Sequence, residues 1–114
     1  MTKVISCWMQ SKMGAMQSGT YIALESDELV MPDDIFALEI DSKKRYFRAM
    51  QVEPERNNRK NNEENVNIFV TAIQCGYYDQ LYKNTDIRKL RNMEAIKVTD
   101  SDELSKIRKE SSYL

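Results

Sequence analysis

The stretch that decides the fold is residues 35–52, which read Ile-Phe-Ala-Leu-Glu-Ile-Asp-Ser-Lys-Lys-Arg-Tyr-Phe-Arg-Ala-Met-Gln-Val. Over residues 35–40 every second side chain from Phe36 is large and apolar. The alternation returns over residues 46–52, where we expect Phe47, Ala49 and Gln51 to share one face. The polar residues 41–44 between the two runs have the length of a hairpin connection. This stretch therefore predicts an antiparallel hairpin.

The same period of two appears in most of the remaining chain. In the N-terminal run we expect Val4, Ser6 and Trp8 to share one face of a strand. Residues 66–75 are the longest run rich in β-branched side chains, which marks a central strand. The expected strands span residues 4–9, 20–25, 35–40, 46–52, 66–75 and 95–98.

Helical signals are concentrated late in the chain. A short helix is expected from Asn84 or Thr85, and another at residues 100–110, where acidic residues open the helix and basic residues close it. The second helix should dock weakly, because its apolar content is only Leu104 and Ile107. The fold class predicted is α+β, mainly β: a small, strongly bent antiparallel sheet or open barrel of five to six strands with one or two short helices towards the C-terminus.

Length and composition indicate one globular domain over residues 1–114. The 114 residues are 41% hydrophobic and 31% charged, with a net charge of -1, which is ordinary for a globular chain. Residues 53–65 contain no large apolar side chain, so we expect an exposed polar loop there. No apolar stretch is long enough to span a bilayer, and the N-terminus lacks an extended hydrophobic region. We expect a cytoplasmic protein that does not bind a membrane.

The side chains needed for common catalytic chemistry are scarce. The chain has no histidine, which removes the commonest general base and the most versatile metal ligand. Cys7 and Cys75 lie in apolar, strand-like runs and are predicted to be buried thiols rather than a disulfide. Four carboxylates could hold Mg²⁺ without any sign that they converge, namely Asp33, Asp34, Glu39 and Asp41. The sequence therefore predicts a protein that is not an enzyme and has no metal or cofactor.

A reversal of charge inside the predicted hairpin points to binding instead. Every ionisable charge in residues 21–41 is acidic, whereas basic residues outnumber acidic ones in residues 43–60. Segregated charge of this kind steers encounters and selects partners. The alternative is that the two blocks pair across neighbouring strands as a solvated face.

Three groups of side chains are the predicted partner contacts. Acidic and basic residues come from the two charge blocks, and a cluster of tyrosines offers large contact area with polar tips. The tyrosines could instead close the end of a barrel. The predicted contacts are Asp27, Glu28, Asp33, Asp34, Lys43, Arg45, Arg48, Tyr77, Tyr78 and Tyr82.

These features favour a non-enzymatic binding module that binds and modulates a protein partner. Its size and its lack of catalytic chemistry suit a small inhibitor or immunity-type protein encoded by a phage or mobile element. The alternative is a small barrel that binds single-stranded RNA or DNA. In that alternative, residues 43–48 would act as a hairpin that interleaves basic and aromatic side chains, which meet phosphates and stack on bases. A nuclease that uses the carboxylates is the least favoured class.

One pattern is shared with known proteins. Residues 31–52 are similar in pattern to barrel-opening hairpins of several small families, among them ribonuclease toxins of toxin-antitoxin systems and immunity proteins that neutralise bacterial toxins. Such hairpins usually carry glycine where Asp33 stands. The likeness is confined to these residues, and a convincing catalytic set for a ribonuclease is missing.

Overall fold

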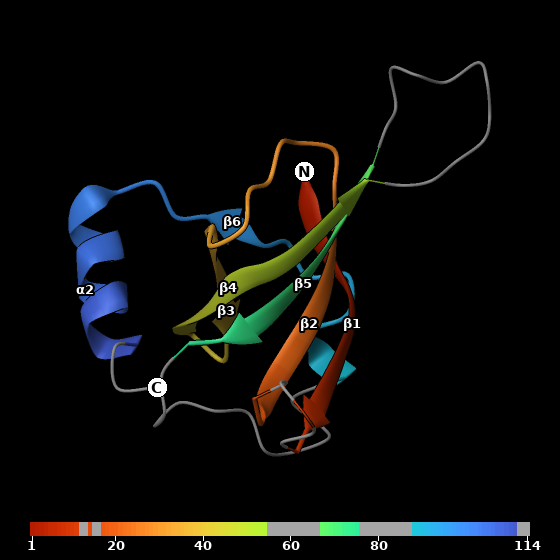
Figure 1. Ribbon diagram of the computed structural model, residues 1–114, viewed down its shortest axis with the longest axis horizontal. Coiled ribbons are helices and arrows are strands. Elements are labelled where there is room, and N and C mark those ends of the chain that lie inside the picture. Colours follow the sequence, from red (N-terminus) through yellow and green to blue (C-terminus); the bar gives the residue numbers. More distant parts are fainter. Residues whose placement is uncertain (12–13, 15–16, 55–66, 76–87, 112–114) are drawn as a thin grey trace.

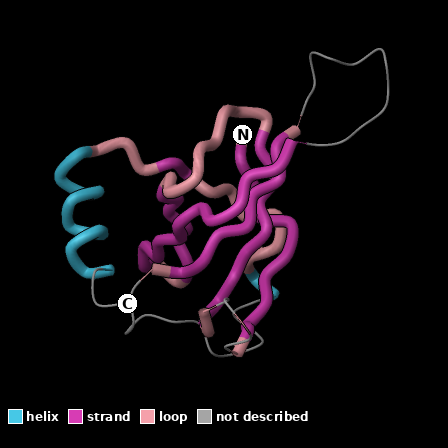
Figure 2. The backbone as a smooth tube through the Cα atoms, viewed as in Figure 1, coloured by secondary structure: helices cyan, strands magenta, loops and turns pink. Residues whose placement is uncertain are grey.

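A computed structural model describes residues 1–11, 14, 17–54, 67–75 and 88–111, and it confirms the predicted mainly β fold. Six strands form one open antiparallel sheet in the order β1-β2-β5-β4-β3-β6 (Figures 1 and 2). One C-terminal helix, α2, lies beside the sheet (Figure 1). The elements are β1 (Thr2–Gln10), β2 (Gly19–Ser26), β3 (Ile35–Ile40), β4 (Lys43–Pro54), β5 (Ile68–Gln74), β6 (Ile96–Lys97) and α2 (Ser101–Ser111).

The predicted hairpin is β3 and β4, and its turn is shorter than the sequence indicated. Ile40 lies opposite Lys43, so only Asp41 and Ser42 form the connection. Both turn residues have positive φ angles, 53° and 66°. Two successive residues with positive φ make a type I′ turn, whose twist matches that of the flanking strands. The predicted connection over residues 41–44 was therefore too long, because Lys43 and Lys44 already belong to β4.

The main core lies on one side of the sheet, which we call the inner face. The strands bend around this face, and the connecting segments add side chains that close its ends. Burial of these apolar side chains is the main stabilisation of the fold. The buried residues of this core are Val4, Ile22, Leu24, Val30, Phe36, Leu38, Ile40, Phe47, Ala49, Val70, Ala72, Leu90 and Ala95.

Two β-bulges make the predicted alternation wrong at two points. In β1 the register passes from Val4, opposite Leu24, to Ser6, opposite Ala23, so these two side chains lie on opposite faces. In β4 the register shifts between Ala49 and Gln51, which separates a second pair that was expected to share a face. A bulge adds one residue to one strand and so reverses the alternation beyond it.

Helix α2 packs on the opposite, outer face of the sheet and begins where the sequence predicts. The Glu103 backbone N–H donates to Asp100 Oδ2 at 2.9 Å, which caps the first turn. Ile107 is only 4% exposed and belongs to a second cluster with Ile35, Ala37 and Val98 from the sheet side. The hairpin is therefore covered on both faces.

Residues 92–97 contact both β1 and β3 at one end of the sheet. The Ala95 N–H donates to Thr2 O at 2.8 Å in β1, and immediately afterwards β6 pairs with β3, with Ile96 opposite Ala37. This segment therefore connects β1 with β3 through backbone hydrogen bonds, without closing the sheet. In the part of the chain that the structure describes, β3 has no neighbouring strand on this side beyond Ala37.

Some predictions fall wholly or partly on residues that are not described. Of the polar loop predicted at residues 53–65, residues 55–65 lie outside the described residues, and Glu53 and Pro54 belong to β4 instead. The predicted helix start at Asn84 or Thr85 also lies outside them. Among the described helices, none has the length and apolarity needed to cross a membrane.

Candidate functional site

The acidic residues that follow β2 contact the amino terminus. The Met1 amino group donates a hydrogen bond to Asp27 Oδ1 and lies 3.7 Å from Glu28 Oε1. The hydrogen bond with Asp27 is the main cause that raises the pKa of the terminal amine, and the same bond lowers the pKa of Asp27. The Asp27 side chain is 65% exposed, so this pair contributes little to stability.

Asp33 and Asp34 belong to a turn of the acidic block that immediately precedes β3. The Asp34 N–H donates to Met31 O at 3.1 Å, and Asp33 has a φ of 73°, as expected for a type II turn with proline at its second position. Asp33 Oδ1 accepts from Arg48 Nη1 at 3.0 Å, and Asp34 Oδ2 lies 3.3 Å from Lys97 Nζ. The positive φ explains why glycine is usual at this position in similar hairpins.

In the described part of the basic block, residues 43–54, two of the cations form ion pairs and a third is half-buried. Lys44 Nζ lies 3.4 Å from Glu103 Oε2 in α2, and Arg48 pairs with Asp33 as described above. Lys43 is exposed, whereas Arg45 is half-buried and its Nε has no hydrogen-bond partner. Within the described residues, Arg48 and Asp33 form an ion pair between the two charge blocks, as the solvated-face alternative expects at this point.

The aromatic side chains of the basic run are engaged within the protein. Phe47 is fully buried in the main core. The Tyr46 hydroxyl donates to Glu103 Oε2 at 2.6 Å beneath α2. The predicted tyrosine contacts Tyr77, Tyr78 and Tyr82 lie outside the described residues.

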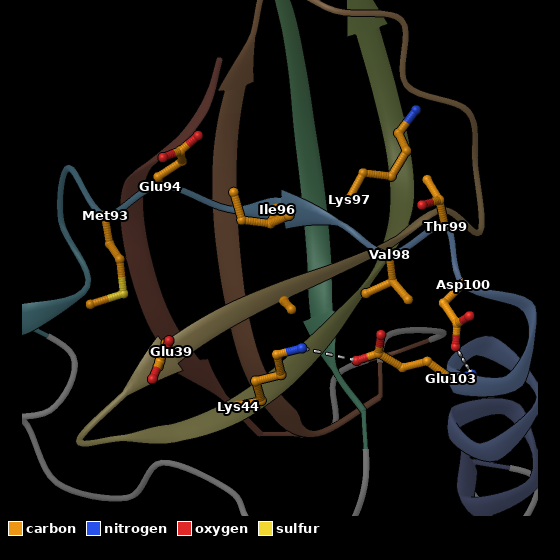
Figure 3. A pocket seen from close by; sticks show the side chains of 11 residues that line it. Glu39, Lys44, Met93, Glu94, Ile96, Lys97, Val98, Thr99, Asp100 and Glu103 are labelled. Carbon is orange, nitrogen blue, oxygen red and sulfur yellow. Dashed lines mark hydrogen bonds and ion pairs between the residues drawn. The ribbon is translucent and has the colours of Figure 1, made fainter.

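A groove of about 430 Å³ opens where β3, the segment before and after β6, and the start of α2 meet (Figure 3). Its lining combines charged and apolar side chains, and Ile96 is 55% exposed there although it is a large aliphatic side chain. An exposed aliphatic side chain in a hollow marks a surface suited to contact with another molecule. The groove is lined by Ala37, Glu39, Lys44, Met93, Glu94, Ile96, Lys97, Val98, Thr99, Asp100 and Glu103.

The carboxylates around the groove differ in how they are paired. Glu103 accepts the hydrogen bond from Tyr46 and lies near Lys44, and these contacts, Tyr46 first, lower its pKa. Glu39 and Glu94 are exposed and make no ion pair or side-chain hydrogen bond within the described residues. In Figure 3 the two side chains lie on opposite sides of the same end of the groove. That end therefore carries two negative charges that form no ion pair with any residue the structure describes, although Lys44 and Lys3 are their cross-strand neighbours.

Backbone groups at this end of the groove also lack strand partners. The Val98 N–H donates to Ile35 O at 2.8 Å, and Ile96 pairs with Ala37. Because an antiparallel ladder uses alternate residues on each side of a strand, the next N–H and C=O of β3 that point this way belong to Glu39. The Glu94 groups point away from β1, since its two neighbours make the bonds to that strand. Neither residue has a strand partner there in the described chain.

The described residues do not assemble a metal site or an activated nucleophile. Among them, no group of three or more histidine, cysteine or acidic side chains lies close enough to hold a metal ion. Cys7 and Cys75 are free thiols, and both are half-buried rather than fully buried. Burial raises the pKa of Cys7 to about 11, which disfavours the reactive thiolate.

Comparisons with known proteins found no relative. No family model matches the chain, and neither the curated proteins nor the solved structures gave a match.

The groove residues were not among the predicted partner contacts. Of those contacts, the structure brings Asp33, Asp34 and Arg48 close together, while Lys43 and Arg45 lie nearer the turn of the hairpin. Sequence patterns gave one signal for the groove, the aliphatic Ile96 next to Lys97 in the strand predicted at residues 95–98. The other lining residues come from separate segments, which no local pattern connects.

Proposed function

We propose that this chain is a non-enzymatic module that binds a protein partner through the groove beside β6. The observation that carries the proposal is the exposed Ile96, which lines the groove with Met93 and Val98. Beside it are the carboxylates of Glu39 and Glu94, which form no ion pair within the described residues. Protein interfaces combine an apolar contact region with polar groups at its rim that give specificity. The groove has both parts in one place.

Charge at the groove favours a protein over a nucleic acid. Its carboxylates would repel phosphates, which dominate the affinity of nucleic-acid binding. In the basic run, Phe47 is buried, and the Tyr46 hydroxyl and Arg48 side chain are engaged with acidic partners. These side chains would have to leave their present contacts before they could stack on bases or meet phosphates. An inhibitory or immunity role remains a prediction from the sequence.

The proposal is tested by capture of a partner with three forms of the immobilised protein. The wild type, Ile96→Asp and the control Met9→Asp are incubated with lysate of the cells that encode the chain, with and without nuclease. Met9 is also a large apolar side chain, 45% exposed, but it lies on β1 and does not line the groove. Both substituted positions are exposed, so thermal midpoints should stay close to that of the wild type.

The proposal expects a protein that the wild type and Met9→Asp retain after nuclease treatment and that Ile96→Asp does not. Retention should also weaken as salt is raised, because part of the attraction is between exposed charges. Capture that disappears with nuclease in every form would support the nucleic-acid alternative. Capture of the same protein by Ile96→Asp would exclude the groove as its binding site.

A further inference from the structure

We propose that the end of the groove between Glu39 and Glu94 holds an arginine side chain presented by the protein partner. This inference rests on the proposed function, because it names the chemistry that the same groove would recognise. It follows from three features of that end of the groove: its charge, its backbone acceptors and the apolar side chains of its lining.

The charge at this end of the groove calls for a cation. Two other carboxylates near it form ion pairs, Glu103 with Lys44 and Asp34 with Lys97, whereas Asp100 accepts the backbone N–H of Glu103. Glu39 and Glu94 form no ion pair among the described residues, although Lys44 lies opposite Glu39 and Lys3 lies opposite Glu94 across the strands. The two carboxylates lie on two sides of one hollow. A cation between them would be attracted by both carboxylates at once, whereas an anionic segment would be repelled.

Backbone acceptors at the same place favour a cation with several donors. Within the described residues, the C=O groups of Glu39 and Glu94 accept no hydrogen bond on the side where β3 and the segment before β6 face each other. With the two carboxylates they offer hydrogen-bond acceptors from two directions. A guanidinium carries five N–H donors in one plane, whereas an ammonium carries three on a single nitrogen. Arginine therefore matches the arrangement better than lysine.

The apolar part of the groove lining suits the remainder of an arginine side chain. Ile96 is exposed there, and Met93 and Val98 contribute further apolar surface. Arginine carries its charge on a hydrocarbon stem that packs on apolar surface while the charged end reaches polar groups. A metal ion or a small polar cation would leave the Ile96 surface uncovered, so this apolar surface also favours a side chain over a free ion.

The inference is tested with short peptides and the isotope-labelled protein. The probe is an acetylated and amidated peptide, Ser-Val-Arg-Val-Ser, and its matched controls carry citrulline, lysine or norleucine in place of arginine. Citrulline has nearly the shape of arginine without its charge. Binding is measured from chemical-shift changes of the backbone amides of Glu39, Ile96 and Val98 at low salt.

We expect the arginine peptide to shift these amides and the citrulline peptide to bind roughly ten- to a hundredfold more weakly, as for the loss of charge-assisted hydrogen bonds. Lysine should fall between the two, and norleucine should bind no better than citrulline. The double change Glu39→Gln with Glu94→Gln should abolish the preference for arginine. The control Glu53→Gln, at the far end of β4 and outside the groove lining, should retain it.

Equal binding of the arginine and citrulline peptides, or no shift at the groove with either, would overturn the arginine inference. If capture of a partner still depends on Ile96 in that case, the proposed function stands and only the named side chain is wrong. If capture is also independent of Ile96, both proposals fall. Retained arginine preference in the double glutamine variant would likewise overturn the inference, because the two carboxylates would not be its source.

Discussion

Replacing Ser42 with glycine should stabilise the protein, because Ser42 has a backbone conformation that glycine adopts without steric cost. Asp41 and Ser42 alone connect β3 to β4, with φ angles of 53° and 66°. A type I′ turn needs positive φ at both positions, and its preferred sequences are Asn-Gly and Asp-Gly. The chain already has aspartate at the first position, so Ser42→Gly completes a preferred pair.

The size of the effect follows from two opposing contributions. A left-handed conformation costs an L-residue roughly 1–2 kcal/mol, whereas glycine loses about 0.5–1 kcal/mol more conformational freedom on folding. The net gain for Ser42→Gly is therefore about 0.5–1 kcal/mol. For a chain of 114 residues the unfolding entropy near 60 °C is about 240 cal/mol/K, so the thermal midpoint should rise by about 2–4 °C.

Thermal unfolding followed by circular dichroism measures this shift, with Ser6→Gly as the matched control. Ser6 is exposed in β1 and does not have a positive φ, so the same substitution there should destabilise the protein by about 0.5–1 kcal/mol. The two variants should thus move the midpoint in opposite directions. If Ser42→Gly lowered the midpoint as Ser6→Gly does, the hairpin would not contain a type I′ turn and the reasoning would be refuted.

Three further predictions concern the packing of α2, the hydrogen bond between Tyr46 and Glu103, and the half-buried thiol of Cys7. Ile107→Ala should lower the free energy of unfolding in urea by about 2–5 kcal/mol, because the Ile107 side chain is only 4% exposed. A decrease of less than about 1 kcal/mol would instead support the weak docking of α2 predicted from the sequence. Tyr46→Phe should raise the pKa of Glu103 in a nuclear magnetic resonance titration, since the Tyr46 hydrogen bond is the main cause that lowers it. The folded-state pKa of Glu103 lies below its ordinary value, so this contact stabilises the fold at pH values above the ordinary pKa. That stabilisation is lost as the pH falls through the folded-state pKa. Tyr46→Phe should therefore reduce the loss of unfolding free energy over this acidic pH range. In a Cys75→Ser background, Cys7 should react only slowly with a disulfide reagent at about pH 8 until denaturant is added. A pKa of about 11 leaves roughly a thousandth of the Cys7 side chain as thiolate at that pH. Rapid reaction of the folded protein would contradict the burial of Cys7.

The sequence by itself determined the local elements of this protein. Alternation in residues 35–40 and 46–52 predicted the β3–β4 hairpin, because a strand with one buried face must place apolar side chains at every second position. The start of α2 was also predictable, since Asp100 can cap the helix and the charges of its first and last turns oppose the helix dipole. Both signals come from residues that are close in the chain.

Only the tertiary structure decided where the alternation breaks. Ile5 and Met50 are the additional residues of the two bulges, and neither has a sequence feature that distinguishes it from its neighbours. A bulge forms when the two strands and the core behind them fit better with one more residue on one side. That fit depends on β2 and β5, which lie far away in the chain.

The groove is likewise a product of the tertiary structure. Glu39 comes from β3, Glu94 and Ile96 come from the segment that passes from β1 to β3, and Glu103 comes from α2. The sequence supplied their charges and apolar surface but carried no information on their distances. Those distances follow from the path of residues 92–97. This segment forms hydrogen bonds with β1 and then with the first half of β3, so the end of β3 has no described strand beside it and the hollow stays open.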